Sequence, residues 1–343
     1  MGRSPLSFTF TKRRTAAALT GAAALALVLA GCGGSDDGGT GGGDAGTEAP
    51  EKLVLGLVPS QEVDQLVLDA DALGEQLSDE LGIPVETNVT ADYSALVVAM
   101  QSGQADIGMF GPIALVQAAD EAGAVPILQS VRYGSESYVT QWFTNEPDRF
   151  CLDDIVEKDV DGATMTYCNG TDVDEVSGPV GEDALEEVAE DESIAFVDAG
   201  SASGYYYPAT QLQQINGFDP VNLSGASFAG GHPNAVQAVA DGDATVGTSF
   251  NDARAELVEE DPEIGENVTV FAWSGNIPND GVAVSADLSE EWQQKVSDAF
   301  LAVADTEEGL AALDAVYSIE GLVPADLDAL DAARQVEANF GEE

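Results

Sequence analysis

Basic residues, histidine and cysteine are scarce in this chain, and each shortage excludes a class of function. The 343 residues include 11 Lys and Arg against 62 Asp and Glu, for a formal net charge of −51. A surface this acidic repels nucleic-acid backbones and anionic membranes, so we expect neither as a partner. One histidine and three cysteines leave little for a zinc site or a histidine-based catalytic cluster. Enzymes that hold a metal by carboxylates stay open, but most other enzyme classes are disfavoured.

Apolar residues, in contrast, are plentiful. Hydrophobic residues make up 44% of the chain. That is enough apolar surface to offset the conformational entropy lost on folding. A length of 343 residues predicts two domains of ordinary size, with room for sizeable cores.

The first 31 residues have the order of features of an export signal. Basic residues come first, and an apolar run over 15–30 follows, shorter than the roughly 20 residues of a membrane-spanning helix. The run ends in Leu-Ala-Gly-Cys at 29–32, which resembles the bacterial lipobox. We therefore expect a lipoprotein signal peptide over 1–31 and a lipid on Cys32. The alternative is an ordinary secretory signal followed by a chance cysteine.

After processing, the chain would be still more acidic and would begin with a tether. The signal contains four basic and no acidic residues, so its removal gives a net charge of −55. Residues 32–51 are rich in Gly and Asp, a composition typical of a flexible, solvated linker. The acidity suggests a saline habitat or a strongly acidic set of secreted proteins, and a lineage composition without adaptive role is the alternative.

Two cysteines remain once Cys32 carries the lipid. Cys151 and Cys168 bracket 16 residues of a polar stretch, in a compartment that permits disulfides. A disulfide there would stabilise this excursion by about 3 kcal/mol on the loop-entropy model. Two free thiols are the alternative.

Short apolar runs alternate with segments of helical periodicity along residues 52–343. Leu66, Leu73 and Leu77 recur near the helical repeat, and Gly82 ends that helix. Such alternation predicts an α/β fold with mostly parallel sheets and helices on both faces. The strands are expected over 53–58, 85–89, 107–110, 125–131, 194–197, 226–228, 245–247, 268–273 and 282–284. Further helices are expected over 92–100, after 112, and over 203–216, 234–240, 252–259, 289–303, 306–316 and 325–339.

Several predicted helices begin with glycine or small polar residues just after a strand. In open α/β sheets, ligands bind beyond the carboxyl ends of strands, where helices begin. Glycine lets the backbone approach a ligand, and free N–H groups at a helix start favour an anion. Plain helix caps are the alternative. The candidate starts are Asp92-Tyr93, Gly111-Pro112, 200–204 and 230–233.

Six segments in order resemble one family, the phosphate, phosphite and phosphonate receptors of ABC transporters. The resemblance runs from about residue 52 to 305, and the segments at 200–205 and 230–232 are its most specific parts. The segments are Gly-Leu-Val-Pro-Ser at 56–60, Ala-Asp-Tyr at 91–93, Ala-Asp-Ile-Gly-Met-Phe-Gly-Pro at 105–112, Gly-Ser-Ala-Ser-Gly-Tyr at 200–205, Gly-Gly-His at 230–232 and Ile-Pro-Asn-Asp at 277–280.

The resemblance implies a two-lobed periplasmic-binding-protein fold of type II, with the ligand in the cleft between the lobes. Lobe one would comprise 52–137 and 249–343, and lobe two would comprise 138–248. The protein would be a monomer, held by its lipid on the extracytoplasmic face of the cell membrane. It would deliver its ligand to an ABC permease, with no cofactor and no metal.

The resemblance also implies a set of ligand-binding residues. Ser201 and Ser203 match the anion-binding helix start, with Ala202 where the family commonly has threonine. His232 matches a donor to the phosphoryl oxygens. The other matches are two aromatics, Tyr93 and more weakly Tyr138, and two carboxylates, Asp280 and more loosely Asp252.

Charge matching decides which ligand this set would favour. In the family's aminoalkylphosphonate receptors two carboxylates hold the ammonium, so Asp280 and Asp252 favour an organophosphonate with a cationic end. A buried carboxylate beside a bare oxyanion is costly and would have a raised pKa. The alternative is that Asp280 accepts a P–OH proton, which suits phosphite or phosphate.

Three other classes of function compete with a transport receptor. An enzyme on the same fold would need a reactive constellation that one histidine does not provide. A sensory lipoprotein that binds an oxyanion and signals through a membrane partner would have the same binding domain, but this chain contains no recognisable signalling domain. A structural lipoprotein is the remaining alternative.

Overall fold

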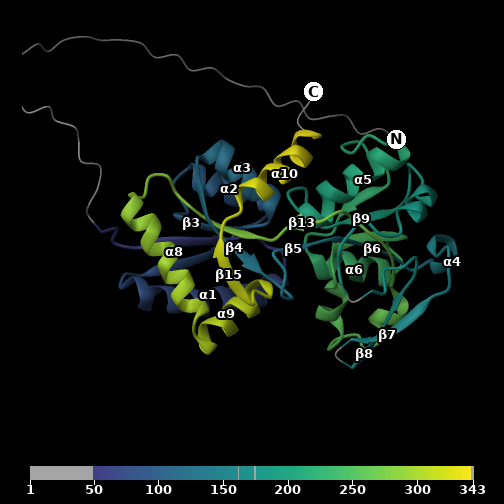
Figure 1. The fold of residues 1–343 in the computed structure, drawn as a ribbon, viewed down its shortest axis with the longest axis horizontal. Helices are drawn as coiled ribbons and strands as arrows, with labels where there is room; N and C mark the ends of the chain where they lie inside the picture. Colours follow the sequence, from purple (N-terminus) through teal and green to yellow (C-terminus); the bar gives the residue numbers. More distant parts are fainter. Residues whose placement is uncertain (1–48, 161, 174, 341–343) are drawn as a thin grey trace, which may run out of the picture. The chain divides into compact units, whose positions relative to one another are not determined.

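The computed structural model describes residues 49–160, 162–173 and 175–340. The predicted signal peptide over 1–31, Cys32 and most of the predicted tether over 32–51 lie outside these residues. The described chain forms two larger β-sheets flanked by helices, together with a two-stranded ribbon (Figure 1).

The first sheet is mixed, and its central strands are buried. It contains β1 (Leu53–Leu57), β2 (Val85–Val89), β3 (Ile107–Phe110), β4 (Val125–Val131), β14 (Gly281–Val284) and β15 (Gly321–Pro324). Their order across the sheet is β15-β4-β14-β3-β1-β2. β1 pairs parallel with β2 and β3, and β14 lies antiparallel between β3 and β4, so β1 to β4 share one direction. All four residues of β3 are buried, as expected of a strand covered on both faces.

Six helices pack around this sheet: α1 (Val63–Leu81), α2 (Tyr93–Gln101), α3 (Pro112–Ala122), α8 (Glu290–Ala304), α9 (Glu307–Tyr317) and α10 (Leu327–Ala338). The predicted helix before Gly82 is confirmed as α1. Its buried residues include Leu66, Leu73 and Leu77, and Gly82 ends it in the left-handed conformation at φ +70°. Side chains of all six helices contribute to one hydrophobic core with the sheet.

The second sheet is also mixed. It contains β6 (Thr140–Thr144), β7 (Val156–Val160), β8 (Ala163–Tyr167), β9 (Ile194–Phe196), β10 (Ala226–Phe228), β11 (Val246–Phe250) and β12 (Thr269–Trp273). Their order is β10-β9-β11-β6-β12-β8-β7, and β6 and β7 run against the other strands. Its helices are α4 (Pro147–Phe150), α5 (Tyr207–Asn216), α6 (His232–Ala240) and α7 (Ile264–Asn267), with a π-helical turn over Ala202–Tyr206 and 3-10 helices over Glu182–Glu187 and Ala253–Leu257.

Two short strands connect the sheets and pair with each other. β5 (Ser137–Tyr138) leads from the first sheet into the second, and β13 (Ile277–Pro278) leads back. The predicted boundary at 249 differs from this arrangement, because β12 belongs to the second sheet. β12 enters that sheet by pairing with β6. Thr269 lies opposite Thr144, 125 positions earlier in the chain, a contact that local sequence does not reveal.

Most predicted elements are present, and the differences lie mainly over 137–168. The predicted polar excursion there contains the antiparallel pair β7 and β8, and β6 is a fully buried strand of mixed polarity. Cys151 and Cys168 form a disulfide across this region, with Cα atoms 5.6 Å apart. The predicted helix over 252–259 is a shorter 3-10 helix, and β11 extends to Phe250.

Candidate functional site

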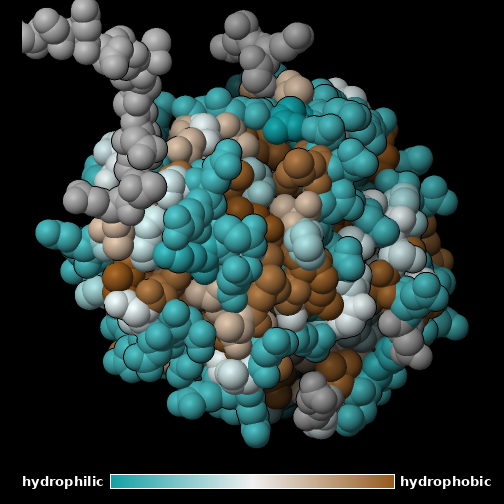
Figure 2. Space-filling view, turned by 60° about the vertical axis from the view of Figure 1, so that its left-hand side comes forward, coloured by the Kyte–Doolittle hydropathy of each residue, from teal (hydrophilic) through white to brown (hydrophobic). Residues whose placement is uncertain are grey.

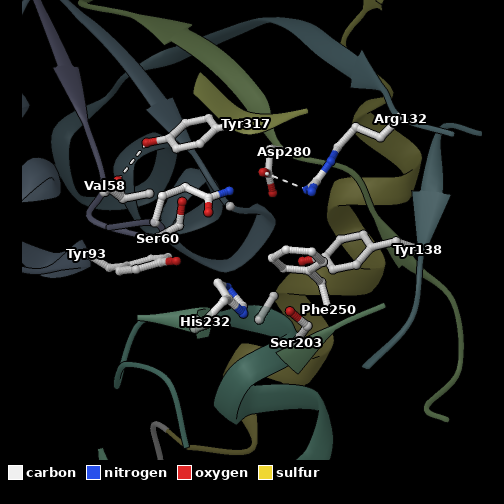
Figure 3. Close-up of a pocket in the computed structure, with 14 residues that line it drawn as sticks. Val58, Ser60, Tyr93, Arg132, Tyr138, Ser203, His232, Phe250, Asp280 and Tyr317 are labelled. Carbon is white, nitrogen blue, oxygen red and sulfur yellow. Dashed lines mark hydrogen bonds and ion pairs between the residues drawn. The ribbon is translucent and has the colours of Figure 1, made fainter. Parts of the chain in front are cut away.

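A small polar cavity lies where the loops of the first sheet meet the helix starts of the second (Figure 3). Its volume is about 20 Å³, whereas roughly 10–15 Å³ already holds one water molecule. It therefore suits a ligand of a few non-hydrogen atoms. Its walls consist of Val58, Ser60, Gln61, Tyr93, Gly111, Arg132, Tyr138, Ser201, Ala202, Ser203, His232, Phe250, Asp280 and Tyr317.

His232 is the first residue of α6 and is 5% exposed. Its Nδ1 lies 2.7 Å from the Ser249 hydroxyl, and its ring packs against Phe250. Burial, with the nearby charge of Arg132, lowers the pKa of His232 to about 3. The imidazole is therefore neutral at pH 7. When the Ser249 hydroxyl donates to Nδ1, the ring proton is on Nε2, where it can be donated to an anion.

The serine segment supplies a helix start on the same side of the cavity. Ser201 and Ser203 are 2% and 1% exposed. The Ser201 hydroxyl accepts from the backbone N–H of Gly204 at 3.1 Å, so it caps the π-helical turn over Ala202–Tyr206 while its own proton remains available. The first turn of a helix leaves N–H groups without helical partners, and these groups favour an anion.

Three tyrosines complete the walls, of which Tyr93 and Tyr317 are buried and Tyr138 is half-buried. Tyr93 begins α2, whose N-cap Asp92 accepts from the N–H of Ala95 at 2.7 Å. Burial raises the pKa of Tyr93 and of Tyr138 far above the ordinary phenol value, with Asp280 adding to the rise. Tyr317 donates to the Val58 carbonyl at 2.7 Å, and burial raises its pKa also. All three remain protonated phenols at neutral pH.

The charged groups of the cavity are Asp280 and Arg132. An Asp280 oxygen lies 3.5 Å from Arg132 Nη1, with 7% of the Arg132 side chain and 19% of the Asp280 side chain exposed. Burial raises the pKa of Asp280, and the Arg132 charge partly opposes that rise. The guanidinium carbon also lies 5.0 Å from the ring centre of Phe250 and 6.0 Å from that of Tyr138.

Asp252, which the resemblance implies as a second ligand-binding carboxylate, does not line the cavity. Its carboxylate meets Arg254 at 2.6 Å and accepts from Tyr167 and Gln141 at 2.8 and 3.0 Å. Burial alone would raise the pKa of Asp252, but the Arg254 charge and these hydrogen bonds lower it overall. The carboxylate is already neutralised by a buried partner.

The other predicted residues meet at the cavity: Tyr93, Tyr138, Ser201, Ala202, Ser203, His232 and Asp280. Sequence reasoning missed Arg132, Tyr317 and Phe250. The one usable signal was for Arg132, which directly follows an apolar strand in a chain with very few basic residues. Tyr317 is the last residue of α9, and nothing near it in the sequence resembles a motif.

The cavity offers hydrogen-bond donors and one carboxylate, and it contains no cysteine. Within 49–160, 162–173 and 175–340, no cluster of three or more His, Cys, Asp or Glu residues could hold a metal ion. The same stretches contain no helix that is both long and apolar enough to span a bilayer. The arrangement can bind and orient an anion.

Two sheets linked by two crossing strands, with this cavity between them, define a type II periplasmic binding protein. The model of the periplasmic substrate-binding proteins of phosphonate ABC transporters matches residues 55–330. The chain belongs to this family.

Named relatives agree with this assignment. The phosphate-import protein PhnD of Mycolicibacterium smegmatis is 26% identical over 338 residues, covering 92% of this chain and 94% of the relative. The phosphonates-binding periplasmic protein of Escherichia coli is 24% identical over 269 residues, covering 78% and 70%. The structure of PhnD1 from Prochlorococcus marinus in complex with methylphosphonate has a similar fold, with a TM-score of 0.68 at 17% identity over 86% of this chain and 100% of that one.

Proposed function

We propose that this protein is the lipid-anchored receptor of an ABC importer and captures a phosphonate, phosphite or phosphate in the cavity described above. One observation carries the proposal. Ser203 and His232, donors from the second sheet, lie across the cavity from Tyr93 and Asp280 of the first sheet (Figure 3), and Ser201 lines the same cavity. Phosphoryl oxygens accept hydrogen bonds from such neutral donors. A P–OH group, in turn, can donate to the free oxygen of Asp280.

Each larger sheet would be the centre of one lobe. On this division lobe one contains the six-stranded sheet and lobe two the seven-stranded sheet, with the crossovers at β5 and β13. Rotation about these two strands would open the cavity to solvent and close it on the ligand. In the closed arrangement the N–H of His232 donates to the carbonyl of Ser60 at 3.1 Å, a backbone bond between the lobes.

The anchor belongs to the same proposal. A lipid on Cys32 would hold the receptor at the extracytoplasmic face of the cell membrane, and residues 33–51 would let it reach the permease. Electrophoretic mobility and membrane fractionation of the wild type and of Cys32→Ala test this step. Release of the Cys32→Ala protein from the membrane is the expected result, and equal membrane retention would contradict it.

Calorimetric titration of the mature protein tests ligand capture. Phosphate, phosphite and methylphosphonate are the candidate ligands, and sulfate is the matched control because it carries no proton at neutral pH. We expect micromolar or tighter binding of at least one phosphorus compound and much weaker binding of sulfate. A folded, ligand-free protein that binds none of them would refute the proposed function.

A further inference from the structure

Arg132 differs from every other buried cation of the described chain in how little it is bonded. Arg254, the comparable case, is fully buried and donates to both oxygens of Asp252 and to the carbonyls of Thr166 and Val268. Arg132 is 7% exposed, and within the described residues its one polar side-chain partner is Asp280 at 3.5 Å. Its Nε has no acceptor within the described residues. A buried guanidinium with unused donors is costly unless an anion completes its bonding.

The backbone holds Arg132 in place before any ligand arrives. Arg132 and Ser135 exchange two backbone hydrogen bonds of 2.9 and 3.0 Å across a tight turn. Gly134 adopts φ +69° in that turn, where glycine is favoured. Asn279 fixes the same turn from the neighbouring chain segment by donating to the carbonyls of Ser130 and Ser135. The residue next to Asn279 is Asp280, so one network positions both members of the ion pair.

Arg132 and Tyr138 also lie between the cavity and a neighbouring surface groove. Both side chains line the small cavity, and both line a groove of about 670 Å³ on the other side. A substituent longer than a methyl group on the phosphorus atom would have to displace this wall to reach the groove. An ammonium on that substituent would in addition be repelled by the positive charge of Arg132. Asp280 is the only carboxylate that lines the cavity, and it is already paired with Arg132.

We infer that Arg132 is the specificity-determining residue of this site and restricts it to compact phosphorus oxyanions without a cationic substituent. This inference rests on the proposed function and revises the ligand expected from the sequence. The spare donors of Arg132 would bind an oxygen of the phosphoryl group, since a guanidinium matches phosphoryl geometry. Asp280 would keep one oxygen on Arg132 and accept a P–OH proton with the other.

Three ligands separate size from charge: methylphosphonate, n-propylphosphonate and 2-aminoethylphosphonate, the last two being nearly isosteric. Calorimetry on the mature protein should give binding in this order, with 2-aminoethylphosphonate at least about 100-fold weaker than methylphosphonate, because placing like charges together is strongly unfavourable. Arg132→Ala should reduce the affinity for methylphosphonate by about 10-fold or more. The same substitution should increase the affinity for 2-aminoethylphosphonate, so that this ligand binds more tightly than methylphosphonate.

Arg334→Ala is the matched control, because it removes one positive charge from an exposed ion pair far from the cavity walls. Its affinities should stay within about twofold of the wild type. Binding of 2-aminoethylphosphonate to the wild type as tightly as n-propylphosphonate would overturn the inference, and this comparison needs no variant. An unchanged ligand order in a folded Arg132→Ala protein would overturn it as well. Failure of the wild type to bind any phosphorus compound would instead refute the proposed function.

Discussion

His232 shows how burial converts an ionisable side chain into a fixed donor. The neutral ring contacts Ser249 through Nδ1 and lines the cavity. In the tautomer that accepts from Ser249, the second nitrogen is a neutral N–H donor. Replacement by alanine should reduce affinity for the best phosphorus ligand by about 1.5–3 kcal/mol, the range for a hydrogen bond to a charged group. Calorimetry measures the loss, and an affinity equal to that of the wild type would remove His232 from the site.

The same residue predicts a pH dependence of stability. The pKa of His232 is about 3 in the folded protein and about 6.5 in the unfolded chain. Between these values the unfolded state holds more protons, so this contribution to stability is complete above pH 6.5. It is lost as pH falls, by up to about 1.4 kcal/mol per pH unit.

Denaturant unfolding of the wild type and of His232→Gln from pH 7 to pH 4.5 checks this prediction. Both proteins share the same carboxylates, so the pH dependence that these carboxylates cause cancels in the difference between the two stabilities. Glutamine at 232 does not titrate. The wild type should lose stability relative to the variant as pH falls, and a constant difference would contradict a neutral, buried His232.

At the level of single residues, those cavity residues that belong to short sequence motifs could be predicted. Ser201, Ser203 and His232 are close to glycines in short segments whose function is local, namely to start a helix beside a ligand. The pairing of Arg132 with Asp280 could not be predicted, because the two residues are 148 positions apart in the chain. Asp252 does not line the cavity. Its partner Arg254 is near in sequence, but Arg254 is held by the carbonyls of Thr166 and Val268, which are distant from one another in the chain.

Contact between α2 and the loop after β9 limits how closely the two lobes approach. A Cβ atom on Gly200 would lie 2.5 Å from Cβ of Tyr93, which is fixed close to the backbone of α2. Gly200→Ala should therefore oppose closure and weaken ligand binding by roughly 10- to 100-fold, as for an overpacked contact of about 1–3 kcal/mol. Calorimetry measures the affinity.

Gly275→Ala is the control for this substitution, because nothing lies within 4 Å of the added Cβ atom. It should bind like the wild type. Equal binding by Gly200→Ala and Gly275→Ala would show that the observed approach of Gly200 to Tyr93 is not needed in the bound state.

Elements with regular periodicity could be predicted, and those defined by long-range pairing could not. The spacing of Leu66, Leu73 and Leu77 identified α1 because amphipathic helices repeat locally. β6 was missed because its sequence, Thr-Gln-Trp-Phe-Thr, has no regular apolar pattern, and its neighbours β11 and β12 are distant in the chain. β12 was predicted as a strand, but its sheet was not, because pairing with β6 is a property of the tertiary structure.

For the molecule as a whole, the acidic surface is the dominant feature. Figure 2 shows one face on which hydrophilic residues predominate, with hydrophobic residues gathered nearer its centre. Because acidic residues far outnumber basic ones, most carboxylates have like charges as neighbours, and their mutual repulsion destabilises the folded state. The melting temperature should therefore rise between 0.01 and 0.15 M NaCl, where the screening length falls from about 30 to about 8 Å.

Scanning calorimetry over that range measures the effect. The range is low enough that screening, rather than exclusion of salt from the protein surface, dominates. A melting temperature independent of salt would indicate that the acidic side chains are spaced widely enough to interact little.

The pairing of β5 with β13 has a consequence for the sequence of binding events. Residues near a rotation axis move least, and Tyr138 lies in β5 while Asp280 follows β13 by two positions. Both would keep nearly the same positions in the open receptor, whereas Ser201 and His232 would arrive only on closing. The ligand would then meet a half-formed site first and be enclosed in a second, unimolecular step. In stopped-flow mixing, the observed rate constant should level off at high ligand concentration, and the plateau would be the sum of the closing and opening rate constants.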